Sequence, residues 1–175
     1  MKMSSGNFKI YDRPGFTAIE LILYIAISSV MLSVISIFLA TVLESRVKNQ
    51  TIAEVEQTAA QVLHLISQTT RNALSINSPA PGLSAPSLSL KVINPAKDPT
   101  VFDLSLGTVR ITEGVSPPVV LTNSRMIASA LNFDNLSRSS TPGTIRFQFT
   151  LTHQNPEGRN EQDFSKNFYG SASLR

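Results

Sequence analysis

Residues 13–21 read Arg13-Pro14-Gly15-Phe16-Thr17-Ala18-Ile19-Glu20-Leu21, and no residue from Leu21 to Leu43 is charged. A helix needs roughly 20 apolar residues to cross the hydrocarbon layer of a membrane, so this run is long enough to span it. Glu20 heads the run, where a lone carboxylate in lipid costs on the order of 2.5–3.5 kcal/mol. An acid in that position needs a partner, and an amine created at Phe16 by cleavage after Gly15 would supply one.

The segment from Gly15 to Leu21, with a basic leader before it and an apolar run after it, resembles the prepilin signature of type IV pilins and type II secretion pseudopilins. The resemblance implies that a membrane aspartyl peptidase cuts after Gly15 and then methylates the new amine of Phe16. Glu20 matches the family's glutamate, whose proposed roles are to neutralise the N-terminal amine of a neighbouring subunit and to set its axial register. The motif is short but specific, and beyond about Leu43 only the layout of the chain is similar.

The leader, residues 1–15, carries most of the chain's excess charge. The whole chain has a formal charge of +3. Removing the leader takes away Lys2, Lys9, Arg13 and Asp12, which leaves 12 basic and 11 acidic residues. The three leader cations satisfy the positive-inside rule and predict a cytoplasmic N-terminus. No basic cluster follows downstream, so we predict no nucleic-acid partner.

An ordinary secretory signal is the main alternative for the first 43 residues, and an anchor that is never processed is another. A secretory signal has a shorter apolar region and is cut after it at small residues. Here a full-length span follows an acid, and no such cleavage site precedes Glu44-Ser45-Arg46. The sequence therefore favours a retained anchor in the cytoplasmic membrane.

The chain contains neither glycine nor proline between Phe16 and Ser78, which predicts an uninterrupted helix. We divide it into a transmembrane and assembly helix, residues 16–43, and an amphipathic helix, residues 44–76. The second part has an apolar stripe at helical spacing, formed by Ile52, Val55, Ala59, Val62, Ile66 and Ala73. The first part has no helix-bending proline. Its serines either bond back to carbonyls and bend the helix or favour close helix packing; they are Ser28, Ser29, Ser33 and Ser36.

Residues 77–87 are rich in proline and serine and predict a linker loop. After it the hydrophobic period changes to two, most clearly where Ile145, Phe147, Phe149 and Leu151 alternate with polar residues. Residues 88–175 are therefore predicted to form an antiparallel β-sheet domain, with weaker strands at 119–121, 128–133 and 168–174. The apolar stripe of the helix is the predicted cover for this sheet. The predicted class is α+β, a long N-terminal helix packed on a C-terminal antiparallel sheet, as in pilins.

No catalytic constellation is visible, and we predict that the chain is not an enzyme. His64 and His153 are far apart in sequence, and isolated histidines are more often solvated or locally hydrogen-bonded than part of a metal site or proton relay. There is no cysteine, so neither a thiol nucleophile nor a disulfide exists. Many pilins close a C-terminal loop with a disulfide, and this chain departs from that pattern.

One acidic loop is a candidate calcium site, and no other cofactor is predicted. Glu157, Glu161 and Asp163 supply hard oxygen ligands just before the last predicted strand, in the region where some pseudopilins bind calcium. However, Arg159 lies among them and the spacing is not that of an EF-hand. A solvated hairpin loop is the preferred interpretation.

The resemblance predicts a structural subunit, a minor pilin or pseudopilin, of a type IV pilus-like filament or a secretion pseudopilus. The implied partners are the prepilin peptidase and methylase, other pilin or pseudopilin subunits, the inner-membrane assembly platform, and membrane lipid before assembly. The chain would start as a single-pass inner-membrane protein and end in an extracytoplasmic filament. The alternative is a membrane-anchored binding or adhesion domain that never polymerises, and an anchored hydrolase is a third, less favoured class.

Overall fold

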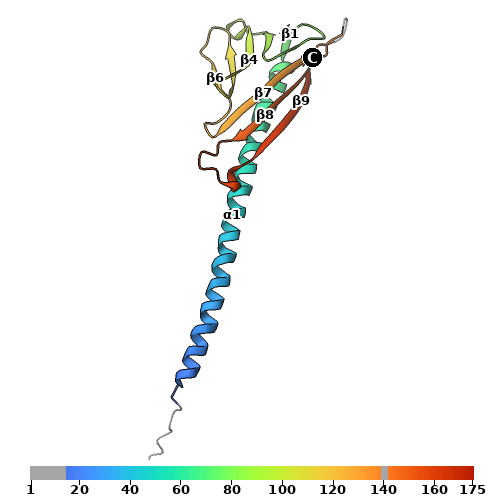
Figure 1. The fold of residues 1–175 in the computed structure, drawn as a ribbon. Helices are drawn as coiled ribbons and strands as arrows, with labels where there is room; N and C mark the ends of the chain where they lie inside the picture. The colour runs from blue at the N-terminus through green and yellow to red at the C-terminus, as the bar shows by residue number, and fades with distance from the viewer. Residues whose placement is uncertain (1–14, 139–141) are drawn as a thin grey trace, which may run out of the picture. The chain divides into compact units, whose positions relative to one another are not determined.

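The computed structural model describes residues 15–138 and 142–175 and divides the chain into two compact units, Met1–Leu43 and Glu44–Arg175. A single helix, α1 (Ala18–Arg71), supplies the apolar run of the first unit and a packed helix in the second (Figure 1). The predicted uninterrupted helix is thus confirmed. Thr17 begins it as an N-cap, since its hydroxyl oxygen accepts a 3.4 Å hydrogen bond from the Glu20 amide.

The helix ends at Arg71, so the predicted amphipathic helix of residues 44–76 is wrong in its last five residues. Strand β1 (Ala73–Ser78) begins there and pairs antiparallel with β3 (Leu88–Val92), placing Ile76 opposite Leu90. The hydrogen bonds between β1 and β3 satisfy backbone groups that a longer helix would also satisfy. The helix therefore ends at this point although the sequence has no glycine or proline to break it. Ala73 is buried as predicted, but it lies on a strand.

The β region forms two antiparallel sheets where the sequence predicted one. The first has the order β1-β3-β4-β5-β6, and its remaining strands are β4 (Thr100–Ser105), β5 (Thr108–Glu113) and β6 (Val119–Val120). The second has the order β2-β7-β8-β9, with β2 (Ser84–Ala85), β7 (Met126–Asn135), β8 (Thr144–His153) and β9 (Ser165–Ser173). Short 3-10 turns lie at Pro95–Lys97 and Asn160–Gln162. The predicted linker, residues 77–87, contains the end of β1 and all of β2.

The core of the second unit lies between the distal part of α1 and the strands, as Figure 1 shows for β7, β8 and β9. The helix contributes four side chains that are at most 1% exposed, namely Val55, Ala59, Val62 and Ile66. The sheets contribute four phenylalanines that are equally buried, namely Phe102, Phe133, Phe147 and Phe149. Each large side chain of this kind contributes about 1.5–3 kcal/mol when it is removed from water. The α+β class and the role of the helical stripe as the cover of the sheet are therefore confirmed.

The β4–β5 hairpin turns through Leu106 and Gly107, both with positive φ, at 49° and 73°. A two-residue turn of this kind suits Asn-Gly, whereas leucine in the left-handed region costs about 1–2 kcal/mol. The Leu106 side chain is fully exposed and gains no burial in return. We expect Leu106→Asn to stabilise the second unit by about 1 kcal/mol, seen as a higher melting temperature by circular dichroism. Leu106→Ala keeps the backbone strain and is the control, and an equal gain from it would contradict this account.

Candidate functional site

The segment before α1 is open around the expected cleavage point. Gly15, Phe16 and Thr17 are not helical, and an added Cβ at Gly15 would meet no atom within 4 Å. The Phe16 side chain is 72% exposed. The bond between Gly15 and Phe16 therefore lies in an exposed, non-helical stretch, which is the kind of backbone that proteases cut. The leader charges predicted at Lys2, Lys9 and Arg13 lie outside the described residues.

Glu20 lies in the first turn of α1, where the positive end of the helix dipole favours a carboxylate. The Tyr24 hydroxyl donates a long hydrogen bond of 3.5 Å to its Oε1 atom. The rings of Phe16 and Tyr24 also contact each other, with centroids 5.7 Å apart. Phe16, Glu20 and Tyr24 thus share one face of the chain at four-residue steps. Sequence reasoning missed Tyr24, although the i to i+4 spacing was a signal for it.

Helix α1 is the one helix among the described residues with the length and composition to cross a membrane. Its most apolar 18-residue window has a mean hydropathy of 2.5, and none of that window is buried within the protein. The hydroxyls of Ser29, Ser33 and Ser36 donate to the carbonyls of Ala26, Ser29 and Leu32, at 2.8–2.9 Å. Back-bonding, one of the two predicted uses of these serines, is therefore present and leaves their donors satisfied without water.

A polar cluster around Glu54 in the second unit joins α1 to the segment just before β7 and to the end of β8. The Glu54 carboxylate accepts a 3.1 Å hydrogen bond from Asn123 and pairs with Arg125 at 3.5 Å. The Nε2 atom of His153, a residue only 9% exposed, lies 3.8 Å from the same carboxylate. A groove of about 380 Å³ runs beside the cluster. Its lining includes Gln50, Thr51, Gln154 and Glu157.

The sequence did not predict this cluster, because Asn123 and Arg125 are 69 and 71 residues away from Glu54. Nothing in local spacing brings such residues together. The two histidines do not form a common site, since His64 is exposed on α1 and His153 is buried beside Glu54. The arrangement connects the helix to the segment just before β7 and to the end of β8.

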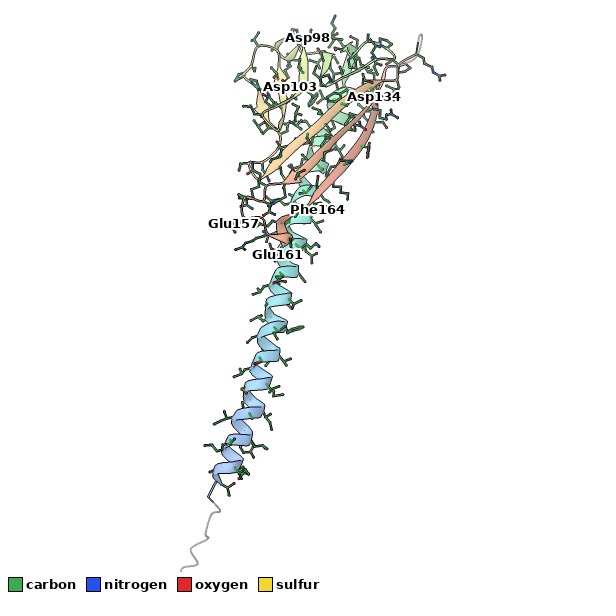
Figure 2. The ribbon with its side chains drawn as sticks, viewed as in Figure 1. Asp98, Asp103, Asp134, Glu157, Glu161 and Phe164 are labelled. Carbon is green, nitrogen blue, oxygen red and sulfur yellow. The ribbon has the colours of Figure 1, made fainter. Side chains whose placement is uncertain are left out.

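The candidate calcium ligands lie in the loop before β9, where Figure 2 labels Glu157 and Glu161. Glu157 forms an ion pair with Arg159 at 2.8 Å. Asn155 braces the same loop, because its side chain bonds both the Arg159 amide and the Arg159 carbonyl, at 2.8 and 2.7 Å. Within residues 15–138 and 142–175, no group of three or more His, Cys, Asp or Glu side chains is placed to hold a metal ion. This geometry does not support the calcium site considered at Glu157, Glu161 and Asp163, which was the less favoured interpretation of the loop.

The strongest functional arrangement is thus the acid, the aromatic pair and the open Gly15 bond at the head of the apolar helix. It combines one carboxylate with a large exposed apolar surface. Comparisons of the chain with family models, with curated proteins and with solved structures give no match.

Proposed function

We propose that this chain is a structural subunit, a minor pilin or pseudopilin, of a membrane-derived filament assembled through its apolar helix. The observation that carries the proposal is Glu20, a single acid in the first turn of a helix whose apolar window is otherwise uncharged and wholly exposed. An exposed apolar surface of this size requires lipid or other apolar helices around it. The open bond after Gly15 provides the matching amine once it is cut.

The physical driving force is the transfer of the apolar helix from lipid into a bundle of like helices. In that bundle, the carboxylate of Glu20 and the amine of Phe16 on a neighbouring copy cancel each other's desolvation cost. The implied partners are a membrane peptidase and methylase, other subunits of the same type and a membrane platform that extracts them. The sheet unit, Glu44–Arg175, would lie on the outside of the bundle.

The proposal is tested by the mass of the mature N-terminus, measured on protein extracted from its native membrane. The expected species begins with N-methylated Phe16. An intact Met1, or a chain that begins beyond Leu43, would overturn the proposal. Either result would favour a tethered binding domain or an exported protein instead.

Gly15→Val is expected to abolish processing and therefore filament formation. The reason is that valine adds branched bulk at the position where a prepilin-type peptidase accepts a small residue. Since an added Cβ at Gly15 meets no neighbouring atom, the variant should fold normally, and its failure would lie in recognition by the peptidase. Mass spectrometry should find only the uncut precursor in the membrane fraction. Gly15→Ala is the matched control and should be cut at a reduced but measurable rate, and full processing of Gly15→Val would contradict the assignment.

A further inference from the structure

The outer face of the second sheet is a broad polar surface. On β8, the residues that alternate with the buried ones are Thr144, Arg146, Gln148, Thr150 and Thr152. Their partners on β9 are equally polar. Gln148 lies opposite Tyr169 and Thr150 opposite Asn167, in a register without bulges. Tyr169 is 64% exposed, so most of its side chain is open to solvent on this face.

A bulge in β7 opens a small hollow on this face. The register shifts between Ser129 and Asn132, and Ala130 there has a φ of 52°. A non-glycine residue in this conformation costs about 1–3 kcal/mol and persists where the surrounding structure enforces it, often at binding sites. The hollow beside it has a volume of about 80 Å³. It is lined by Ala130, Gln148, Phe149, Thr150, Asn167 and Tyr169.

The hollow offers hydrogen-bonding groups that the protein leaves unused. Thr150 donates a 2.7 Å hydrogen bond to the Asn167 side-chain oxygen, which orients the Asn167 amide and leaves its NH2 group available. Among the described residues, the Gln148 amide and the Tyr169 hydroxyl have no protein partner. The amides of Gln148 and Asn167 therefore lie beside the exposed phenol ring of Tyr169.

The face carries no net charge in the described part of the chain. Its charged residues there are Asp134, labelled in Figure 2, and Arg146, whose Nε and Nη2 atoms lie 3.0 and 2.9 Å from Asp134 Oδ2. A 2.6 Å hydrogen bond from Ser84, followed by the Arg146 contact, holds the pKa of Asp134 below its ordinary value, so the pair is fully ionised and neutral overall at pH 7. A neutral surface does not select nucleic acids or acidic lipid headgroups, which need clustered cations.

We propose that this hollow binds a neutral glycan. The Tyr169 ring provides a flat apolar surface for the C–H face of a sugar, while Gln148 and Asn167 donate to and accept from its hydroxyls. A protein partner fits less well, because the cores of protein interfaces are apolar and this face has few aliphatic side chains. The hollow is much smaller than drug-sized pockets, so the dissociation constant for a hexasaccharide is on the order of 0.1–1 mM.

The test uses the full chain in an amine-oxide detergent, since detergents with sugar headgroups would compete for the site. Chitohexaose and cellohexaose are the probes, and binding is followed by calorimetry and by amide shifts in nuclear magnetic resonance spectra. We expect Tyr169→Ala to weaken binding tenfold or more and Tyr169→Phe to retain it within about threefold, because stacking needs only the ring. Asn167→Ala should weaken binding, whereas Asn77→Ala, which removes another exposed amide on a strand of the other sheet, should not.

Three results would overturn the proposal. The first is no binding of either probe at a concentration 10-fold above the upper end of the expected range of dissociation constants. The second is binding that Tyr169→Ala leaves unchanged. The third is stronger binding of heparin oligosaccharides than of the neutral probes. Concentration-dependent self-association that Tyr169→Ala abolishes, without glycan binding, would assign the face to a second copy instead. Thermal melts of each variant establish that the sheet remains folded. The measurement uses unassembled protein, so its result does not depend on cleavage at Gly15 or on filament formation.

Discussion

Glu20→Gln is expected to reduce filament yield at least tenfold while leaving membrane insertion and cleavage after Gly15 intact. Glutamine has the shape of the acid but no charge, so the amine of a neighbouring Phe16 would be buried in the helix bundle without a counter-ion. Removing one partner of a buried ion pair costs about 3–5 kcal/mol, and each 1.4 kcal/mol changes an equilibrium tenfold. In the proposed filament this loss would recur at every subunit contact. The measurement is the ratio of sheared filament to membrane-bound protein on immunoblots.

Tyr24→Phe is the matched control for this prediction. It removes the hydroxyl that lies 3.5 Å from Glu20 but keeps the ring that contacts Phe16, so filament yield should stay within about twofold. Mass spectrometry of Glu20→Gln must still show cleavage, which separates an assembly defect from a processing defect. Wild-type filament yield and subunit spacing from Glu20→Gln would show that the acid has no assembly role. The chain would then be better explained as a tethered domain whose function lies in its sheets.

The features that sequence predicted correctly are those with a strong local period. Val55, Ala59, Val62 and Ile66 recur at helical spacing, and the structure buries all four against the sheets. Ile145, Phe147, Phe149 and Leu151 alternate strictly with polar residues, and the structure buries these four on the inner face of β8. In both cases one face must leave water, so the period of the apolar residues alone determines which side is buried.

The features that sequence missed depend on contacts between distant residues. No helix-breaking residue lies near Arg71, where α1 ends. The helix ends there because Ala73, in the strand that follows, pairs with Val92. The bulge at Ala130 was equally hidden, because alanine is not a turn former and the mismatch appears only when β7 pairs with β8. The Glu54 cluster required the strand order to be known. At the site, the sequence motif identified Gly15, Phe16 and Glu20, whereas the contact of Tyr24 with Glu20 was found in the structure.

Gly170→Ala is expected to destabilise the second unit by about 1–3 kcal/mol, although its backbone conformation suits any residue. A Cβ at this position would lie 2.6 Å from Phe147 Cζ and 3.1 Å from Leu63 Cδ2. The Phe147 ring is completely buried, so it has no free space to move into. The new methyl group would therefore push β9 away from the helix. Thermal unfolding followed by circular dichroism measures the loss, and Ser171→Val, on the exposed face one residue along, should stay within about 0.5 kcal/mol of wild type.

A double-mutant cycle identifies the cause. Phe147→Leu removes the distal ring atoms that a methyl group added at position 170 would strike, while leaving an apolar side chain in the core. In that background Gly170→Ala should cost much less, giving a coupling of about 1–2 kcal/mol between the two positions. Additive effects would instead place the cost outside the contact with Phe147, at Leu63 Cδ2 on the helix. Because that contact and Leu63 lie between the sheet and the helix, a strong coupling would mean that glycine at position 170 sets how closely β9 approaches α1.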